Sequence, residues 1–120
     1  MKRILYVEDN PDTSGAVKIL LTHAGYDIDT ALTGEEGLKK AFGNNYDLLL
    51  LDVMLPDMSG WDIYAKLKNK IKTKYAFLSA IPVSADRMDQ LKKEGVSDYI
   101  TKPFVRADLL ERIAIILDSK

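Results

Sequence analysis

The 120-residue sequence contains no cysteine and only one histidine, His23. Without cysteine the chain has no disulfide framework, no thiolate zinc site and no cysteine nucleophile. A single histidine also excludes a histidine-rich metal centre, and it argues against a Ser-His-Asp triad. Any metal site in this chain would therefore have oxygen ligands.

The sequence also lacks a charge surplus of one sign and lacks long hydrophobic runs. Seventeen Lys and Arg residues against eighteen Asp and Glu residues give a net charge of -1. That balance disfavours a general electrostatic grip on nucleic acid. The apolar runs at 4–7 and 48–51 each end at an acidic residue, so neither fits a membrane span or a signal peptide. We expect a cytoplasmic protein.

Apolar runs and helical patterns alternate five times along the chain. Short strands are predicted at 4–7, 26–32, 47–51, 75–79 and 98–101, and helices are predicted around 17–24, 33–42, 59–71, 84–94 and 110–117. This alternation is typical of a parallel sheet with helices on both faces. We expect an α/β, doubly wound, five-stranded parallel sheet in one domain spanning 1–120. Because the sequence ends soon after Leu117, we expect no attached output domain.

Several packing details are also predicted. The segment 26–32 alternates Tyr26, Ile28, Thr30 and Leu32 with polar residues, as a strand at a half-solvated sheet edge would. Capping boxes are predicted at 33–36 and 59–62. We expect three aromatic residues in or near the core: Phe42, Trp61 and Tyr64.

Polar side chains follow four of the five predicted strands. Glu8 and Asp9 follow the first strand, Asp52 the third, Ser79 ends the fourth, and Lys102 follows the fifth. In open α/β sheets, ligands bind outside the carboxyl ends of the strands, where the connections change direction. The second strand contributes nothing comparable, which fits the strand order 2-1-3-4-5, with the binding crevice between strands one and three.

These residue types together favour phosphoryl chemistry. Three carboxylates held close together repel unless a cation lies among them, and the natural cation is Mg²⁺, with Mn²⁺ as an alternative. An aspartate can accept a phosphoryl group, and Lys102 and Ser79 supply a positive charge and a hydroxyl donor for its oxygens. Each residue alone is a weak signal, and their joint placement at the strand ends is a strong one.

The sequence resembles the receiver domain of two-component response regulators over its whole length. The resemblance rests on four motifs: Ile4-Leu-Tyr-Val-Glu-Asp-Asn-Pro11, Leu51-Asp-Val-Met-Leu-Pro-Asp-Met-Ser-Gly60, Leu78-Ser-Ala80 and Asp98-Tyr-Ile-Thr-Lys-Pro-Phe104. It implies a flavodoxin-like (βα)5 fold. It further implies a single-domain response regulator that takes a phosphoryl group from a histidine kinase or a histidine phosphotransfer protein.

The resemblance also assigns roles to individual residues. It makes Asp52 the phospho-acceptor and Ser79 and Lys102 the groups that bind the phosphoryl oxygens. Its Mg²⁺ ligands are Glu8 (through water), Asp9, Asp52 and the backbone carbonyl of Met54. Ser79 and Tyr99 are its switch pair, the Lys102–Pro103 peptide is often cis, and Met54 and Ile81 flank the path of attacking water. The downstream protein partner would bind the face formed by the fourth helix, fifth strand and fifth helix.

Two other readings remain open at this point. A phosphatase of the haloacid-dehalogenase type also uses Asp, Ser or Thr, and Lys. That family needs an acid two residues after the nucleophile, where this chain has Met54, and it places the nucleophile on the first strand, under a cap. The other alternative is an adaptor that works without phosphorylation. We expect a switch that catalyses only its own phosphorylation and dephosphorylation, not a turnover enzyme.

Overall fold

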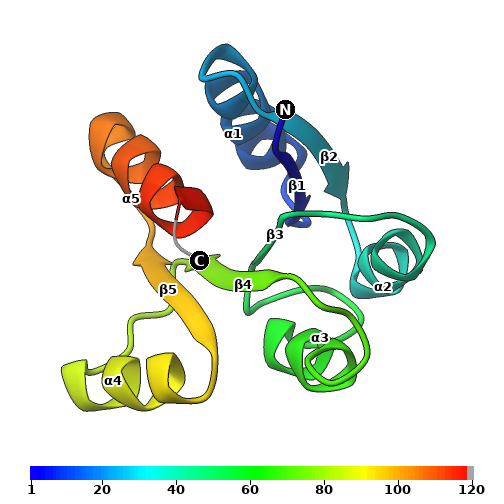
Figure 1. The fold of residues 1–120 in the computed structure, drawn as a ribbon, viewed down its shortest axis with the longest axis vertical. Helices are drawn as coiled ribbons and strands as arrows, with labels where there is room; N and C mark the ends of the chain where they lie inside the picture. Colours follow the sequence, from blue (N-terminus) through cyan, green and yellow to red (C-terminus); the bar gives the residue numbers. More distant parts are fainter. Residues whose placement is uncertain (119–120) are drawn as a thin grey trace.

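The computed structural model describes residues 1–118 and shows five strands alternating with five helices (Figure 1). Their bounds are β1 Arg3–Val7, α1 Pro11–His23, β2 Asp27–Ala31, α2 Gly34–Gly43, β3 Leu48–Leu51, α3 Gly60–Leu67, β4 Lys74–Ser79, α4 Ala85–Lys93, β5 Val96–Thr101 and α5 Arg106–Asp118. Among these residues, the helices are all too short or too polar to cross a membrane.

The strands form one parallel sheet in the order β2-β1-β3-β4-β5, which confirms the predicted topology. The central strand β3 is a run of four buried leucines, as expected for a strand covered on both faces. Val7 of β1 pairs with Leu51 of β3, so the residues that follow these two strands emerge side by side. The connections from β1 and from β3 lead towards opposite edges of the sheet, and a crevice is expected where they diverge.

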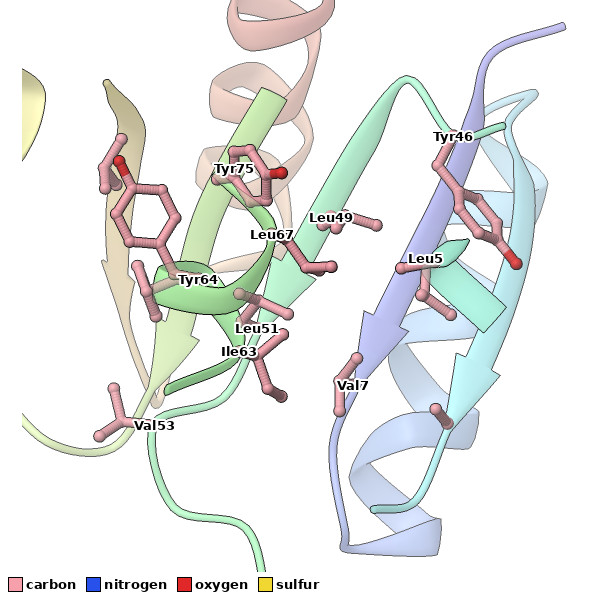
Figure 2. Close-up of a cluster of buried hydrophobic side chains, with 14 of the residues drawn as sticks. Leu5, Val7, Tyr46, Leu49, Leu51, Val53, Ile63, Tyr64, Leu67 and Tyr75 are labelled. Carbon is pink, nitrogen blue, oxygen red and sulfur yellow. The ribbon is translucent and has the colours of Figure 1, made fainter. Parts of the chain in front are cut away.

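Helices cover both faces of the sheet and bury two separate hydrophobic layers. Helices α1 and α5 pack on one face, and α2, α3 and α4 pack on the other (Figure 1). Strand residues alternate between the layers: Leu5 and Leu49 face α3, whereas Ile4 and Leu48 face α1 and α5. In Figure 2 the side chains of α3 lie over those of β1 and β3.

The predicted strand position of Leu32 and the predicted core position of Phe42 are both wrong. Leu32 is 43% exposed, because β2 ends at the buried Ala31 and the chain then turns into α2. Phe42 is 57% exposed. Helix α2 instead turns Gly37 and Ala41 towards the sheet, and Gly37 lies so close to Val7 that an added Cβ would be 2.8 Å from Val7 Cγ2. This close contact rotates Phe42 away from the core.

Of the two predicted capping boxes, the one at 59–62 is confirmed and the one at 33–36 is only half formed. Ser59 and Asp62 form the complete capping box of α3, and Ser84 caps α4. At α2, the Thr33 hydroxyl accepts a hydrogen bond from Glu36 N, but the Glu36 carboxylate accepts one from Leu32 N instead of closing the box on Thr33. Gly95 ends α4 with φ of 108°, a left-handed conformation that favours glycine.

Candidate functional site

The carboxyl ends of β1 and β3 bring three acidic side chains together. One oxygen each from Glu8, Asp9 and Asp52 lies within 4.8 Å of the others. Backbone hydrogen bonds hold these residues in place: Asp52 N donates to the Val7 carbonyl at 3.0 Å, and Glu8 N donates to the Ala31 carbonyl at 3.0 Å. Glu8 and Asp52 are buried and Asp9 is exposed, so the cluster opens to solvent on one side.

Lys102 reaches the same cluster from the end of β5. Its ammonium group forms ion pairs with Glu8 Oε1 and with Asp52 Oδ2, the latter at 3.1 Å. The Lys102 backbone N–H donates to the Ser79 carbonyl at 2.8 Å, which ties this residue to the end of β4. The Lys102–Pro103 peptide bond is cis, as the family resemblance implied.

The pKa values of the two buried carboxyl groups are shifted in opposite directions. Burial raises the pKa of Glu8 above its usual range, and the neighbouring Asp52 adds to that rise. Burial also opposes ionisation of Asp52, but hydrogen bonds from Glu8 and Lys102 outweigh burial and hold the pKa of Asp52 below its usual range. Of these two carboxyl groups, Asp52 is therefore the one that ionises more readily.

The loop after Asp52 is held tightly at its base. Met54 N donates to Asp52 Oδ1 at 3.2 Å, and Met54 and Ser59 form an isolated antiparallel bridge. Gly60 lies against the Asp52 carbonyl, where an added Cβ would be only 2.1 Å from that oxygen. This close approach requires glycine at position 60.

Ser79 ends β4 and Tyr99 lies on the neighbouring β5, opposite Phe77; both are buried, each 1% exposed. The Ser79 hydroxyl accepts a hydrogen bond from Ile81 N at 3.3 Å, and the Tyr99 hydroxyl donates to the Ile81 carbonyl. The Tyr99 ring also stacks on Phe77, with centroids 5.9 Å apart. Both side chains thus contact the segment that leads from β4 to α4.

Sequence reasoning missed Tyr6, whose buried hydroxyl donates to Glu8 Oε1 at 3.3 Å. Tyr6 and Glu8 are two residues apart at the end of one strand, a spacing that places side chains on the same face. That spacing was the available signal, but a tyrosine in an apolar strand reads first as a core residue. The structure makes Tyr6 part of the surroundings of the acidic cluster.

The chain matches the response regulator receiver domain family over residues 4–114. It is 38% identical over 117 residues to the response regulator ArlR of Staphylococcus aureus, an alignment that covers 98% of this chain and 53% of ArlR. The chain therefore spans about half the length of the curated relatives that it matches.

Solved structures of similar sequence share the fold. The response regulator TrrA from Thermotoga maritima, in complex with Mg²⁺-BeF, is 37% identical with a TM-score of 0.83, covering 97% of this chain and 99% of TrrA. A CheY-like receiver domain from Methanospirillum hungatei is 34% identical with a TM-score of 0.87, covering 98% of this chain and 94% of that one.

A parallel sheet in this order, with acids and a lysine converging at its carboxyl edge, defines a signalling switch domain of the CheY-like class. The chain belongs to the response regulator receiver domain family of two-component signalling. Receiver domains are switch proteins, not turnover enzymes, and acceptance of a phosphoryl group is general in the family. The oxygen-rich cluster of Glu8, Asp9 and Asp52 has the ligand chemistry of a divalent metal site.

Proposed function

We propose that this chain is the phospho-accepting switch of a response regulator, with Asp52 as the acceptor and Mg²⁺ as its cofactor. The observation that carries the proposal is the ion pair of Lys102 with Asp52 beside two further carboxylates. A carboxylate kept charged next to a lysine can attack phosphorus, and the lysine then neutralises a phosphoryl oxygen.

In this proposal an Asp52 oxygen forms the bond to phosphorus, while the bond from phosphorus to the donor breaks and the donor leaves with the electron pair. The donor is a phosphohistidine of a histidine kinase or of a phosphotransfer protein. Ser79 donates its hydroxyl to a phosphoryl oxygen. Glu8, Asp9, Asp52 and the Met54 carbonyl would hold Mg²⁺, or Mn²⁺, which would neutralise the acids and the phosphoryl oxygens. The Mg²⁺-BeF complex of TrrA supports this assignment.

The proposed readout is a packing change on the face formed by α4, β5 and α5. Tyr99 and Ser79 both contact the segment between β4 and α4, so a shift of Ser79 towards Asp52 would be transmitted to α4. A downstream protein that binds this face in a phosphorylation-dependent way would complete the signal. We place the protein in the cytoplasm.

Incubation with acetyl phosphate and Mg²⁺, followed by intact mass measurement, tests the proposal. The wild type should gain one labile phosphoryl group, and Asp52→Asn should gain none. Asp9→Ala and EDTA should each slow the reaction. An adduct of equal yield on Asp52→Asn would overturn the acceptor assignment. An equal rate in EDTA would overturn the metal role.

The same experiment separates the alternatives. A phosphatase would turn over phosphate esters, and an adaptor that works without phosphorylation would show neither reaction. Met54 stands where the haloacid-dehalogenase phosphatases need an acid, and Asp52 follows the third strand. Both features favour the switch over the phosphatase.

A further inference from the structure

The loop between β3 and α3, residues 53–59, is attached to the start of α2 through Asp57. The two Asp57 carboxylate oxygens accept hydrogen bonds from Gly34 N at 2.8 Å and from Glu35 N at 2.9 Å. These are amides of the first turn of α2, which have no acceptor within their own helix. The two bonds hold the pKa of Asp57 below its usual range. Asp57, at least 22 residues away in sequence, thus accepts hydrogen bonds from two free amides at the start of α2.

Packing supports the same attachment. Gly34 lies against Met58, so closely that an added Cβ would be 2.3 Å from Met58 Cγ and 3.2 Å from Asp57 Oδ1. Any larger residue at position 34 would displace the Met58 side chain from α2. The first residue of α2 is therefore shaped to receive residues 57 and 58 of the loop.

The other end of this loop carries the Met54 carbonyl, a proposed Mg²⁺ ligand. Asp52 precedes the loop, and Gly60 follows it and lies against the Asp52 carbonyl. Within residues 1–118, Asp57 supplies the only side chain of residues 53–59 that hydrogen-bonds to an element distant in sequence. The base of the loop is fixed by its own backbone, Leu55 and Met58 pack against the core, and Asp57 supplies the hydrogen bonds that tie the outer part to α2.

We propose that Asp57 is a positioning residue for the metal site: by fastening residues 53–59 to α2, it holds the Met54 carbonyl in its ligand position and couples metal binding to α2. The inference rests on the proposed function, because it takes the Met54 carbonyl as a ligand. Asp57 itself does not touch the metal. A ligand that is held in place before binding loses less conformational entropy when the metal binds.

The coupling also runs in the reverse direction. If the attachment of α2 to the loop strengthens metal binding, then metal binding must strengthen that attachment by the same factor. Saturation with Mg²⁺ should therefore slow hydrogen exchange of the amides in the first turn of α2. A residue that only caps a helix would produce no such response.

The experiment measures Mg²⁺ affinity by following backbone amide NMR shifts of residues 52–59 in the wild type, Asp57→Ala, Asp57→Asn, Gly34→Ala and Thr33→Ala. Thr33→Ala is the matched control, because the Thr33 hydroxyl caps the same helix by accepting from Glu36 N but does not contact the loop. We expect the dissociation constant to rise about tenfold in Asp57→Ala, the lower end for loss of a residue that orients a ligand.

The other variants make the result specific. Asp57→Asn keeps one acceptor oxygen and should fall between Asp57→Ala and the wild type. Gly34→Ala should weaken Mg²⁺ binding although alanine favours helix, since it displaces Met58. Thr33→Ala should bind Mg²⁺ within about twofold of the wild type, as expected for a cap whose loss costs about 1 kcal/mol of helix stability only. In the wild type, but not in Asp57→Ala, Mg²⁺ should slow exchange in α2.

Each remaining outcome counts against a definite statement. Equal Mg²⁺ affinity in Asp57→Ala and the wild type would overturn the positioning role, and so would an equal loss in Thr33→Ala. If Asp9→Ala binds Mg²⁺ as tightly as the wild type, the metal site of the proposed function is wrong, and the positioning inference fails with it. The Asp9→Ala titration therefore distinguishes the two failures.

Discussion

At the scale of single residues, Lys102 is the counter-charge of two buried carboxyls. Its side chain is 17% exposed and contacts both Glu8 and Asp52. Hydrogen bonds and charge attraction from these acids outweigh its burial and raise the pKa of Lys102. A group whose pKa is raised on folding stabilises the fold below its unfolded value of about 10.4, and loses that effect as the pH rises through the folded value.

We predict that Lys102→Met lowers the free energy of unfolding by about 2 kcal/mol at neutral pH in EDTA, because it leaves two buried acids unpaired. Urea unfolding measures the loss. Mg²⁺ should restore part of the stability, since a ligand that binds only the native state stabilises it. Lys18→Met, at an exposed position of α1, is the control and should change little. Equal stability of Lys102→Met and the wild type would contradict the prediction.

A second prediction concerns the lifetime of the phosphorylated state. By family resemblance Met54 and Ile81 flank the path of attacking water, and both are apolar and solvent-accessible, at 65% and 37% exposed. Neither side chain can orient water, so the adduct on Asp52 should persist. Met54→Asn combined with Ile81→Glu should shorten its half-life several-fold, measured by intact mass after removal of acetyl phosphate. Met54→Leu with Ile81→Val is the apolar control. If the polar double variant loses its phosphoryl group no faster than this control, Met54 and Ile81 do not control hydrolysis.

The sequence predicts which residues meet at this site, because parallel strands deliver their carboxyl ends to one edge. Glu8, Asp52 and Lys102 were predicted on that basis, and the structure brings them together. Tyr6 and Asp57 were not predicted. Their roles depend on where one hydroxyl points and on how a loop meets a helix far away in sequence. The two-residue spacing of Tyr6 and Glu8 indicates a shared face but not this hydrogen bond, and no local pattern encodes the contact of Asp57 with α2.

At the scale of elements, the coupling of β4 and β5 to α4 depends on two side chains. The Tyr99 hydroxyl donates to the Ile81 carbonyl, and Ile81 N donates to Ser79. Ser79→Ala should leave Asp52 open to phosphorylation by acetyl phosphate and should weaken the conformational response. Tyr99→Phe should keep phosphorylation nearly intact while removing the bond to Ile81, with less damage to packing than Tyr99→Ala.

Amide NMR shifts of residues 84–118 on addition of beryllofluoride, a phosphoryl mimic, measure this response. We expect smaller shifts on the α4, β5 and α5 face in both variants than in the wild type. Thr101→Val, at an exposed position of β5, is a control that should keep the full pattern. If both Ser79→Ala and Tyr99→Phe also keep it, the coupling runs through other residues.

The helix boundaries were predictable where a cap is local. Ser59, Ser84 and Gly95 mark their helix ends in the sequence and in the structure. The orientation of α2 was predictable only in part: Ala41 is buried and Leu38 packs against the core, as their spacing indicates, whereas Phe42 is exposed. The contact of Gly37 with Val7 overrides that spacing at Phe42. The rotation of α2 about its axis thus depends on a close contact with β1, which the sequence of α2 alone does not reveal.

At the scale of the whole molecule, the strand order was predictable because alternation of strands and helices leaves few topologies. The acid stability of the protein depends partly on Asp29 of β2, which contacts α2 and the segment between α2 and β3. The Asp29 carboxylate accepts from Tyr46 at 2.7 Å and pairs with Lys40 at 3.1 Å. Burial opposes its ionisation, but these partners prevail and lower its pKa.

A lowered carboxyl pKa stabilises the fold above the unfolded value of about 3.9, and the effect is lost as the pH falls through the folded value. We predict that Asp29→Asn lowers the free energy of unfolding by about 1 kcal/mol or less at pH 7. The effect is small because the side chains of Lys40 and Asp29 are 33% and 37% exposed, so solvent screens their ion pair. Urea unfolding from pH 7 down to the acid limit should show the difference shrinking. A difference that stays constant with pH would contradict the charge argument. Asp12→Asn, on exposed α1, controls for the loss of a charge elsewhere.

The position of Trp61 makes its fluorescence a probe of one of the two hydrophobic layers. It is the sole tryptophan of the sequence, and its ring lies 4.2 Å from Phe77 and 6.0 Å from Tyr99, in the layer under α2, α3 and α4. Its emission therefore reports that layer and is blind to the layer under α1 and α5. Far-ultraviolet circular dichroism senses all five helices. Since the two layers share every strand of one sheet, both signals should change at the same urea concentration, and a gap between them would reveal that the halves melt separately.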